Sequence, residues 1–251
     1  MKVKKVALFG GVGNKLFQIA HGKYLCQKGF DVVFVDFSYK ESLLVNALFK
    51  WTKHEDWLNL ENVFTKEKFI YPSLAQELLF IIEYIILRIT RKEGLIFNFD
   101  IGYYQNIKGN HSESISWVAD KIKKNLSKKE DSSHSIIHFR GKDFTYSEKE
   151  YQIEIIRQVI NQEKDLSFSL VSDDADTFYE KFSDKKIKNL SSNQLNDFIT
   201  IMNAQNIILS DSTFAFWALL AGHNPNKKYF IGKKNLYLID AFMKHVVIKV
   251  F

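Results

Sequence analysis

The sequence predicts an α/β fold made of two halves, each with a parallel sheet covered by helices. Short apolar runs rich in Val, Ile and Phe alternate with longer stretches of helical periodicity. These runs are continuous, which is typical of parallel strands buried on both faces. A charged, serine-containing stretch at 128–133 separates two such series and predicts domains over 1–130 and 131–251. We therefore expect two Rossmann-like halves whose sheets face each other across a cleft.

The first half opens on an apolar strand that runs into two glycines. The expected elements are a strand over 3–9, a helix over 14–27 and a strand over 31–36, followed by a mainly helical region over 39–109. The second half alternates more regularly. Its expected strands cover 135–139, 167–172, 206–209 and 228–231, and its expected helices cover 148–162, 175–182, 196–204 and 214–221.

One apolar helix, expected over 74–89 and begun by Ser73, raises the question of membrane contact. It is shorter than the roughly 20 residues that span a bilayer, and it contains Glu77, Glu83 and Arg88. We expect a largely buried helix. The alternative is an interfacial helix, in which the segment 74–92 makes peripheral contact with lipid phosphates.

Composition narrows the function classes. The chain has 251 residues, of which 46% are hydrophobic and 25% charged, so a disordered tail is excluded. Its only cysteine, Cys26, excludes an intramolecular disulfide and any multi-cysteine metal site. A net charge of +6 favours anionic ligands, but no basic stretch is interleaved with aromatic residues, so we expect no nucleic-acid partner.

A glycine-rich turn follows the first strand, and Gly11, Gly13 and Asn14 belong to it. Glycines let the backbone turn sharply beside a ligand, and the helix that follows offers free N–H groups to an anion. One interpretation is a dinucleotide site of an NAD-linked oxidoreductase, with Asp36 on the ribose. Leu16 occupies the position where that fingerprint needs its last glycine. A plain strand-to-helix turn is the other alternative.

The strand expected over 135–139 ends in a cationic cluster. Arg140 is well placed to bind a phosphate with both guanidinium nitrogens, Lys142 adds a point charge, and Asp143 can orient a guanidinium or accept a proton. A surface ion-pair cluster is the alternative.

Two further strand ends carry polar side chains. Asp173 and Asp174 can cap a helix, bind a base edge or ligate a metal, but no histidine accompanies them, so we expect no metal site. Ser212 and Thr213 begin an aromatic helix, and their hydroxyls either cap that helix or contact a phosphate.

The order of these motifs resembles that of bacterial α-1,2-fucosyltransferases (glycosyltransferase family 11) over nearly the whole chain. The segments that carry the resemblance are GGVGNKLFQIAHG (10–22), GYYQ (102–105), HFRGKDF (138–144), SDD (172–174) and NDFITIMNAQNIILSDSTFAFWALL (196–220). The chain departs from the family pattern at five positions. Lys15 stands in place of Gln, Gly141 in place of Arg, Lys142 in place of Gly, Asp211 in place of Asn and Phe216 in place of Trp.

The resemblance implies a GT-B architecture and an inverting transfer of fucose from GDP-fucose, without a metal or other cofactor. The implied acceptor is a galactose-containing glycan or lipid-linked oligosaccharide in the synthesis of surface polysaccharide such as O-antigen. The implied donor-binding residues are Gly11, Gly13, Asn14, His138, Arg140, Lys142, Asp173, Asp174, Ser212 and Thr213. Tyr103, Tyr104 and Gln105 would shape the acceptor side.

Within that interpretation Arg140 and Asp143 are the expected catalytic residues. Arg140 would stabilise the departing pyrophosphate, and Asp143 would accept the proton of the acceptor hydroxyl, with Asp36 and His21 as other candidates for the base. We expect a cytoplasmic enzyme, with peripheral contact at the inner face of the membrane as a further alternative. A non-catalytic, membrane-peripheral assembly protein is the remaining hypothesis.

Overall fold

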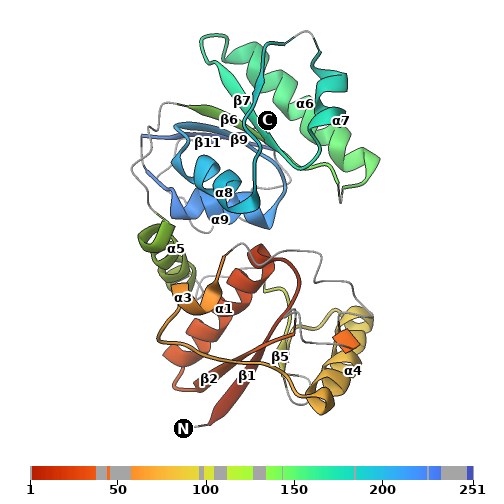
Figure 1. The fold of residues 1–251 in the computed structure, drawn as a ribbon, viewed down its shortest axis with the longest axis vertical. Helices are drawn as coiled ribbons and strands as arrows, with labels where there is room; N and C mark the ends of the chain where they lie inside the picture. Colours follow the sequence, from red (N-terminus) through yellow and green to blue (C-terminus); the bar gives the residue numbers. More distant parts are fainter. Residues whose placement is uncertain are drawn as a thin grey trace. The chain divides into compact units, whose positions relative to one another are not determined.

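The computed structural model describes residues 2–37, 44–45, 58–95, 99–104, 112–126, 134–142, 144–183, 185–224, 226–232 and 248–250. The chain divides into two compact units, Met1–Asn125 and Leu126–Phe251 (Figure 1). Each unit holds one sheet with helices packed on it, so the prediction of an α/β fold with two parallel sheets is confirmed. The expected linker at 128–133 lies outside the described residues.

The first unit is built on a five-stranded sheet with the order β3-β2-β1-β5-β4. Its elements are β1 (Val3–Leu8), α1 (Val12–Gln27), β2 (Asp31–Asp36), α3 (Leu60–Val63), β3 (Lys68–Ile70), α4 (Leu74–Thr90), β4 (Gly94–Leu95), β5 (Asp100–Ile101) and α5 (Ser112–Leu126). All strand pairs are parallel except β4 with β5.

The expectation of a mainly helical region over 39–109 is wrong for part of the described chain, which contains β3, β4 and β5. These strands are two or three residues long, too short to show an alternating pattern. They are strands because they pair with longer partners: β3 pairs with β2, and β5 pairs with β1 at Val6.

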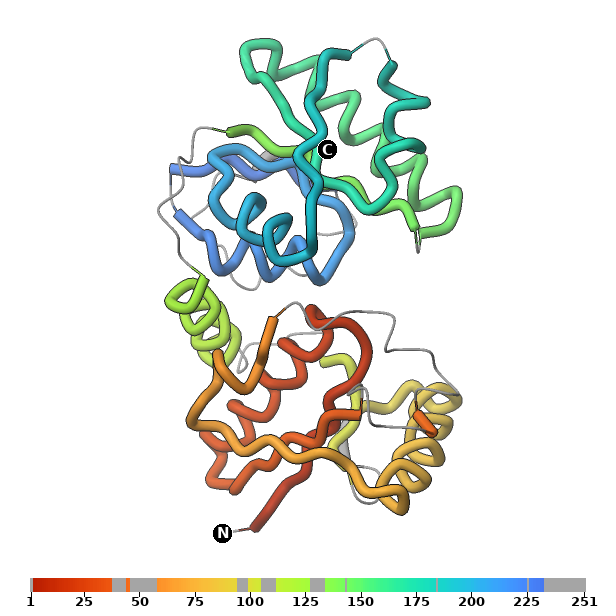
Figure 2. The backbone as a smooth tube through the Cα atoms, in the orientation of Figure 1, coloured from red at the N-terminus to blue at the C-terminus, as the bar shows by residue number. Residues whose placement is uncertain are grey.

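Helices cover both faces of the first sheet, as the continuous apolar strands predict. α1 lies along β1 and β2 (Figure 2). Gly22 of α1 leaves room there for the ring of Phe34. On the other face α4 packs Phe80 and Leu87 into a core with Phe9. β1 and β5 are parallel neighbours in this sheet, so their carboxyl ends lie at the same edge.

The second unit is a six-stranded sheet with the order β11-β10-β9-β6-β7-β8, in which every pair is parallel. Its elements are β6 (Ser135–Phe139), α6 (Tyr146–Gln162), β7 (Phe168–Ser172), α7 (Ala175–Lys181), β8 (Lys188–Asn189), α8 (Gln194–Asn203), β9 (Asn206–Leu209), α9 (Thr213–Ala221), β10 (Lys228–Ile231) and β11 (Ile248–Val250). α6 and α7 lie on one face of this sheet, and α8 and α9 on the other (Figure 1).

The strand order of the second sheet reverses direction once. In the second unit the chain leaves β6 toward β7 and β8, and later leaves β9 toward β10 and β11. β6 and β9 are neighbours, so the connections after them diverge to opposite faces. In the first unit the chain leaves β1 toward β2 and β3, and β5 is the parallel neighbour of β1 on its other side. Crevices beyond the carboxyl ends of such strand pairs are where open α/β sheets bind ligands.

No helix in the described part of the chain is long and apolar enough to cross a lipid bilayer. The expected apolar helix is present as α4, and Ser73 begins it in a capping box with Gln76. The expectation that it is largely buried is wrong, because several of its large apolar side chains are exposed. The helix ends at Arg91, whose left-handed conformation (φ 55°) closes the last turn.

Candidate functional site

The carboxyl ends of β6 and β9 bring Arg140 and Ser212 together. Arg140 directly follows β6, and Ser212 ends the loop between β9 and α9. The Arg140 Nη1 donates to the Ser212 Oγ at 3.4 Å, although 72 residues separate them in sequence. β6 and β9 are parallel neighbours, so their carboxyl ends lie at the same edge of the sheet and the two residues that follow them come into contact.

Ser212 occupies the N-cap position of α9, but its hydroxyl does not cap the helix. It is buried and accepts the hydrogen bond from Arg140 instead. The N-terminus of α9, which begins at Thr213, places the positive end of the helix dipole beside this hydroxyl. A guanidinium, a hydroxyl and a helix N-terminus at one place make a site suited to a phosphate oxygen.

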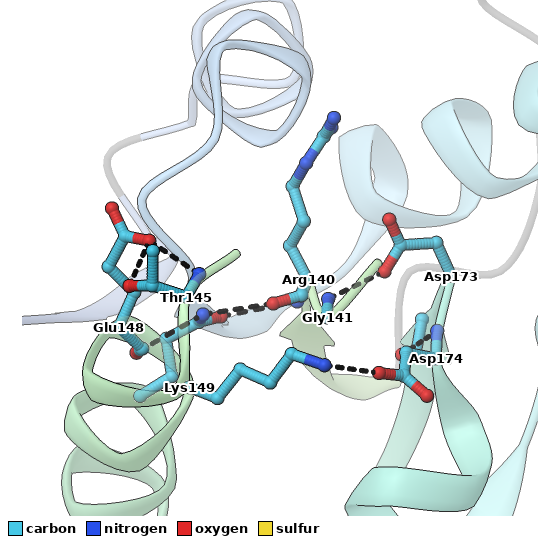
Figure 3. A network of polar contacts seen from close by, with 9 residues as sticks. Arg140, Gly141, Thr145, Glu148, Lys149, Asp173 and Asp174 are labelled. Carbon is cyan, nitrogen blue, oxygen red and sulfur yellow. Dashed lines mark hydrogen bonds and ion pairs between the residues drawn. The ribbon is translucent and has the colours of Figure 1, made fainter. Parts of the chain in front are cut away.

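The backbone of Arg140 is held by Gln152 on α6. The Arg140 N–H donates to the Gln152 Oε1 at 3.1 Å, and the Gln152 Nε2 donates to the Arg140 carbonyl at 3.0 Å. α6 itself begins in a capping box between Thr145 and Glu148. Figure 3 shows the Arg140 side chain extending away from the ion pair of Lys149 with Asp174.

The two aspartates after β7 are engaged with the loop that follows Arg140. The Gly141 N–H donates to Asp173 Oδ1 at 2.7 Å, and Lys149 Nζ pairs with Asp174 Oδ2 at 2.9 Å (Figure 3). Burial acts to raise the pKa of Asp174, but the hydrogen bonds from Lys149 and Thr177 outweigh it and hold that pKa below its usual value. These carboxylates brace the loop beside Arg140.

Gly141 has a steric role in this arrangement. A Cβ at this position would lie 2.3 Å from Asp174 Oδ2 and 2.4 Å from Asp174 Cβ. Asp174 fills the space that a larger side chain would need, so the structure accommodates only a glycine here without a shift of the loop.

His138 is a buried, neutral member of the site. Its Nδ1 lies 2.6 Å from Ser210 Oγ, and its ring stacks near Phe214 with centroids 5.9 Å apart. Burial, with a smaller effect of the Arg140 charge, lowers the pKa of His138 to about 3. A cavity of about 10 Å³ next to it, lined also by Tyr151 and Gly232, has room for one water. His138 thus supports the strand end and adds no charge.

The other predicted residues of this half lie around the same loops. Lys142 and Asp211 are exposed, while Thr213 is the first residue of α9. Asp143, the expected base, lies outside the described residues.

The glycine turn of the first unit follows β1 as expected. Gly10 has φ 78°, a conformation that favours glycine, and Gly11 is the N-cap of α1 without a side-chain cap. Gly13 and Asn14 lie in the first turn of α1. Gln18 ties this turn to the end of β5: it accepts from the Phe9 N–H at 3.0 Å and donates to the Gly102 carbonyl at 3.1 Å. Gln18 therefore connects the two predicted motifs that follow β1 and β5.

The predicted acceptor residues Tyr103 and Tyr104 follow β5 in a tightly held turn. Glu93 Oε1 accepts from both of their N–H groups, at 2.7 and 2.9 Å, and Tyr104 has φ 51°. Such a conformation in a non-glycine residue stores strain that the surrounding contacts must offset. The Tyr103 ring packs on Phe9, while Tyr104 stacks on His21 with centroids 3.8 Å apart. Gln105 lies outside the described residues.

Two of the residues considered as a base or a ribose ligand are already engaged. Asp36 forms an ion pair with the fully buried Lys15, with Nζ and Oδ2 3.1 Å apart. His21 Nε2 lies 3.1 Å from Asp100 Oδ1. Burial acts to raise the pKa of Asp100, but hydrogen bonds from His21 and Tyr104 keep it below its usual value. The Lys15 pair and the buried Leu16 both disfavour the NAD interpretation.

Sequence reasoning missed Gln152, Lys149 and Glu93. Gln152 carried a usable signal, because a glutamine on the apolar face of an amphipathic helix needs buried partners. Lys149 and Glu93 carried none, since their partners follow other strands and no local pattern connects them. Within the described part of the chain, no group of three or more His, Cys, Asp or Glu side chains could hold a metal ion.

No protein-family model matches this chain, and no curated protein does. Some solved structures are partly similar. E. coli heptosyltransferase WaaC with ADP-2-deoxy-2-fluoro heptose is 12% identical, with a TM-score of 0.46 over 99% of this chain and 93% of that one. E. coli ADP-heptose LPS heptosyltransferase II is 13% identical, with a TM-score of 0.42 over 100% and 90%. A glycosyl transferase family 9 structure from Veillonella parvula is 8% identical, with a TM-score of 0.42 over 100% and 85%. At such low similarity, the reaction has to be argued from the site itself.

Proposed function

We propose that this protein is an inverting, metal-independent glycosyltransferase that moves fucose from GDP-fucose to a galactoside hydroxyl. The observation that carries the proposal is the contact between Arg140 and Ser212 at the N-terminus of α9, at the reversal point of the second sheet. The motif resemblance implies that the nucleotide is GDP and the sugar fucose. The Arg140–Ser212 contact supports a phosphate-binding role for this place.

The proposed phosphate site combines three kinds of donor. The Arg140 guanidinium presents a planar, always charged fork to phosphate oxygens. The Ser212 hydroxyl can donate to an oxygen while it accepts from Arg140, and the first N–H groups of α9 add the positive end of the helix dipole. A diphosphate needs several donors of this kind, because its charge is spread over many oxygens.

The rate acceleration in this proposal comes from stabilising the leaving group. Breaking the bond between fucose and GDP develops negative charge on the diphosphate and positive character on the sugar. Donors already fixed in place meet that charge without reorganising, and removing one such donor typically lowers the rate about 10²–10³-fold. Gln152 fixes the backbone from which the Arg140 side chain starts, and so keeps it in place.

The proposed base is Asp143. Asp36 is paired with Lys15, and His21 is hydrogen-bonded to Asp100, so each of these already has a structural partner. Asp143 would accept the proton of the acceptor hydroxyl as the new glycosidic bond forms. In this proposal the glycine turn at the carboxyl end of β1 contributes to donor binding, and the Tyr103–Tyr104 turn at the carboxyl end of β5 shapes the acceptor side.

The test is a donor screen on the purified protein. Thermal shift and calorimetry against GDP, GDP-fucose, GDP-mannose, UDP-glucose and NAD report which nucleotide stabilises the folded chain, and release of GDP from each GDP-sugar reports turnover. We expect stabilisation by both GDP-sugars and by GDP, and transfer or slow hydrolysis with GDP-fucose alone. Asp143→Asn separates the base from binding: it should retain GDP affinity and lose turnover.

Three results would reject the proposal or part of it. Stabilisation by NAD and not by GDP would favour the oxidoreductase. Binding of no nucleotide would leave the non-catalytic assembly protein. Turnover of GDP-mannose in preference to GDP-fucose would retain the glycosyltransferase and replace the donor.

A further inference from the structure

α4 has an apolar face that the first unit leaves uncovered. Six large apolar side chains on it have exposed fractions between 41% and 76%: Leu74, Leu78, Leu79, Ile82, Ile85 and Ile89. Most are spaced three or four residues apart, so they lie on one side of the helix. Contiguous exposed apolar surface of this kind usually marks contact with a protein or a membrane.

The acidic residues of α4 are turned inward. Glu77 is buried, and its Oε2 accepts from the N–H groups of Leu44 and Val45 at 2.8 and 3.2 Å. Glu83 is also buried and accepts from the Phe99 N–H at 3.2 Å. In sequence these carboxylates argue against lipid contact, but in the fold they satisfy backbone groups of the protein interior. The exposed side of α4 therefore carries no carboxylate.

Exposed cations stand at the C-terminal end of the same helix. Arg88 lies in its last turn, where it also interacts with Tyr103, and Arg91 and Lys92 follow directly. The surface therefore combines an apolar stripe with a cationic end. We call this surface, Leu74–Ile89 with Arg91 and Lys92, the α4 face.

We infer that the α4 face binds the surface of an anionic lipid bilayer, with α4 lying in the interface and not across it. The apolar stripe would enter the boundary between headgroups and acyl chains, and the cations would contact lipid phosphates. The 17 residues of α4 suit this orientation, since they are too few to span the hydrocarbon core.

Charge complementarity favours a bilayer over a second copy of the chain. In a symmetric pair of α4 faces, each copy would offer the other an apolar stripe and more cations, because both glutamates are buried. No residue of the α4 face would then neutralise Arg91 and Lys92, and the carboxylate of Glu93, which follows them, already accepts from the N–H groups of Tyr103 and Tyr104. An anionic bilayer supplies apolar and negatively charged layers within a few ångströms of each other, which matches the helix along its length.

The test is co-flotation of the full-length protein with vesicles of phosphatidylcholine alone or with about 30% phosphatidylglycerol. The apolar variant is Leu78→Gln/Ile82→Gln/Ile85→Gln, and the charge variant is Arg91→Gln/Lys92→Gln. Matched controls change exposed residues elsewhere: Val3→Gln/Tyr146→Gln for the apolar set and Lys123→Gln/Lys124→Gln for the charge set. Melting curves confirm that each variant is folded, and GDP binding, measured separately, tests the proposed function.

We expect the wild type to bind anionic vesicles and to detach as salt rises. The apolar variant should lose more than tenfold in affinity, and the charge variant about fivefold per cation on anionic vesicles only. The controls should bind like the wild type. The inference is overturned if the wild type does not bind vesicles, or if the apolar variant binds as well as its control. It is also overturned if sedimentation shows that α4 holds two copies together in place of lipid contact.

Discussion

The side-chain amide of Gln152 forms two hydrogen bonds with the backbone of Arg140, one to its N–H and one to its carbonyl. Because Arg140 directly follows β6, these bonds fix the direction in which the strand end leaves the sheet. The Arg140 side chain then reaches Ser212 on the far side of the β6–β9 boundary. One buried amide on α6 thus controls where the guanidinium starts.

Gln152→Leu should destabilise the protein by about 1–3 kcal/mol, because it leaves two backbone groups of Arg140 without their partner. It should also weaken GDP binding, since the guanidinium loses its fixed origin. Gln158→Leu on the same helix is the control: the Gln158 amide bonds to the exposed Glu154 one turn away, so its change should stay within about 0.5 kcal/mol. Urea unfolding measures both, and equal effects of the two variants would contradict the role of Gln152.

Two glycines should differ in how much their substitution by alanine destabilises the protein. Gly141→Ala forces a Cβ into Asp174 and should destabilise the protein by about 1–3 kcal/mol. Gly11→Ala meets nothing within 4 Å and has φ −70°, so it should fold with nearly unchanged stability. Thermal unfolding of the two variants compares them directly. A Gly141→Ala protein as stable as Gly11→Ala would show that the Asp174 loop yields freely.

His138 should make stability fall as pH falls. Its pKa is about 3 in the fold and 6.5 in a free side chain, so below pH 6.5 the unfolded chain takes up a proton that the folded chain does not. The free energy of unfolding should drop by up to about 1.4 kcal/mol per pH unit between these two values from this residue. Above pH 6.5 the residue contributes no pH dependence.

His138→Gln should therefore flatten the fall in stability between pH 6.5 and pH 4.5, measured by urea unfolding at several pH values. The exposed His134→Gln is the control and should leave the slope unchanged. Parallel curves for wild type and His138→Gln would mean that His138 takes up its proton in the folded protein.

The buried pair of Lys15 and Asp36 should be essential to the first unit. Lys15→Met leaves the Asp36 carboxylate without its cation and should cost about 3–5 kcal/mol of stability. The double variant Lys15→Met/Asp36→Leu should recover much of that loss, because no unpaired charge remains. Lys28→Met, at the exposed end of α1, is the matched control. A single variant as stable as that control would show that the pair does not hold the first unit together.

The regular part of the fold could be predicted from the sequence, because local hydrophobic patterns indicate its strands and helices. β6, β7, β9 and β10 are continuous apolar runs, and each is found within one residue of its expected bounds. β3, β4, β5 and β8 could not be predicted, since two or three residues carry no period and pair only through longer strands. The inward direction of Glu77 and Glu83 was equally hidden, because their partners are backbone groups distant in sequence.

The candidate site was predictable to the level of strand ends. Residues that directly follow parallel strands gather at one edge, and this rule alone predicts that Arg140 and the Ser212 turn lie close together. The contacts that hold the loop after β6 in place were not predictable, because no local pattern connects the residues involved. They are the Gln152–Arg140 and Gly141–Asp173 hydrogen bonds and the Lys149–Asp174 ion pair.

The most direct test of a diphosphate site at Arg140 and Ser212 is calorimetry of GDP and of guanosine with the wild type, Arg140→Lys, Ser212→Ala and the exposed control Arg157→Lys. We predict that GDP binding weakens about 10–100-fold in Arg140→Lys and measurably in Ser212→Ala, since a lysine keeps the charge but loses the planar fork. Guanosine binding should be unchanged in every variant, and Arg157→Lys should match the wild type. GDP binding by Arg140→Lys with wild-type affinity would contradict the account.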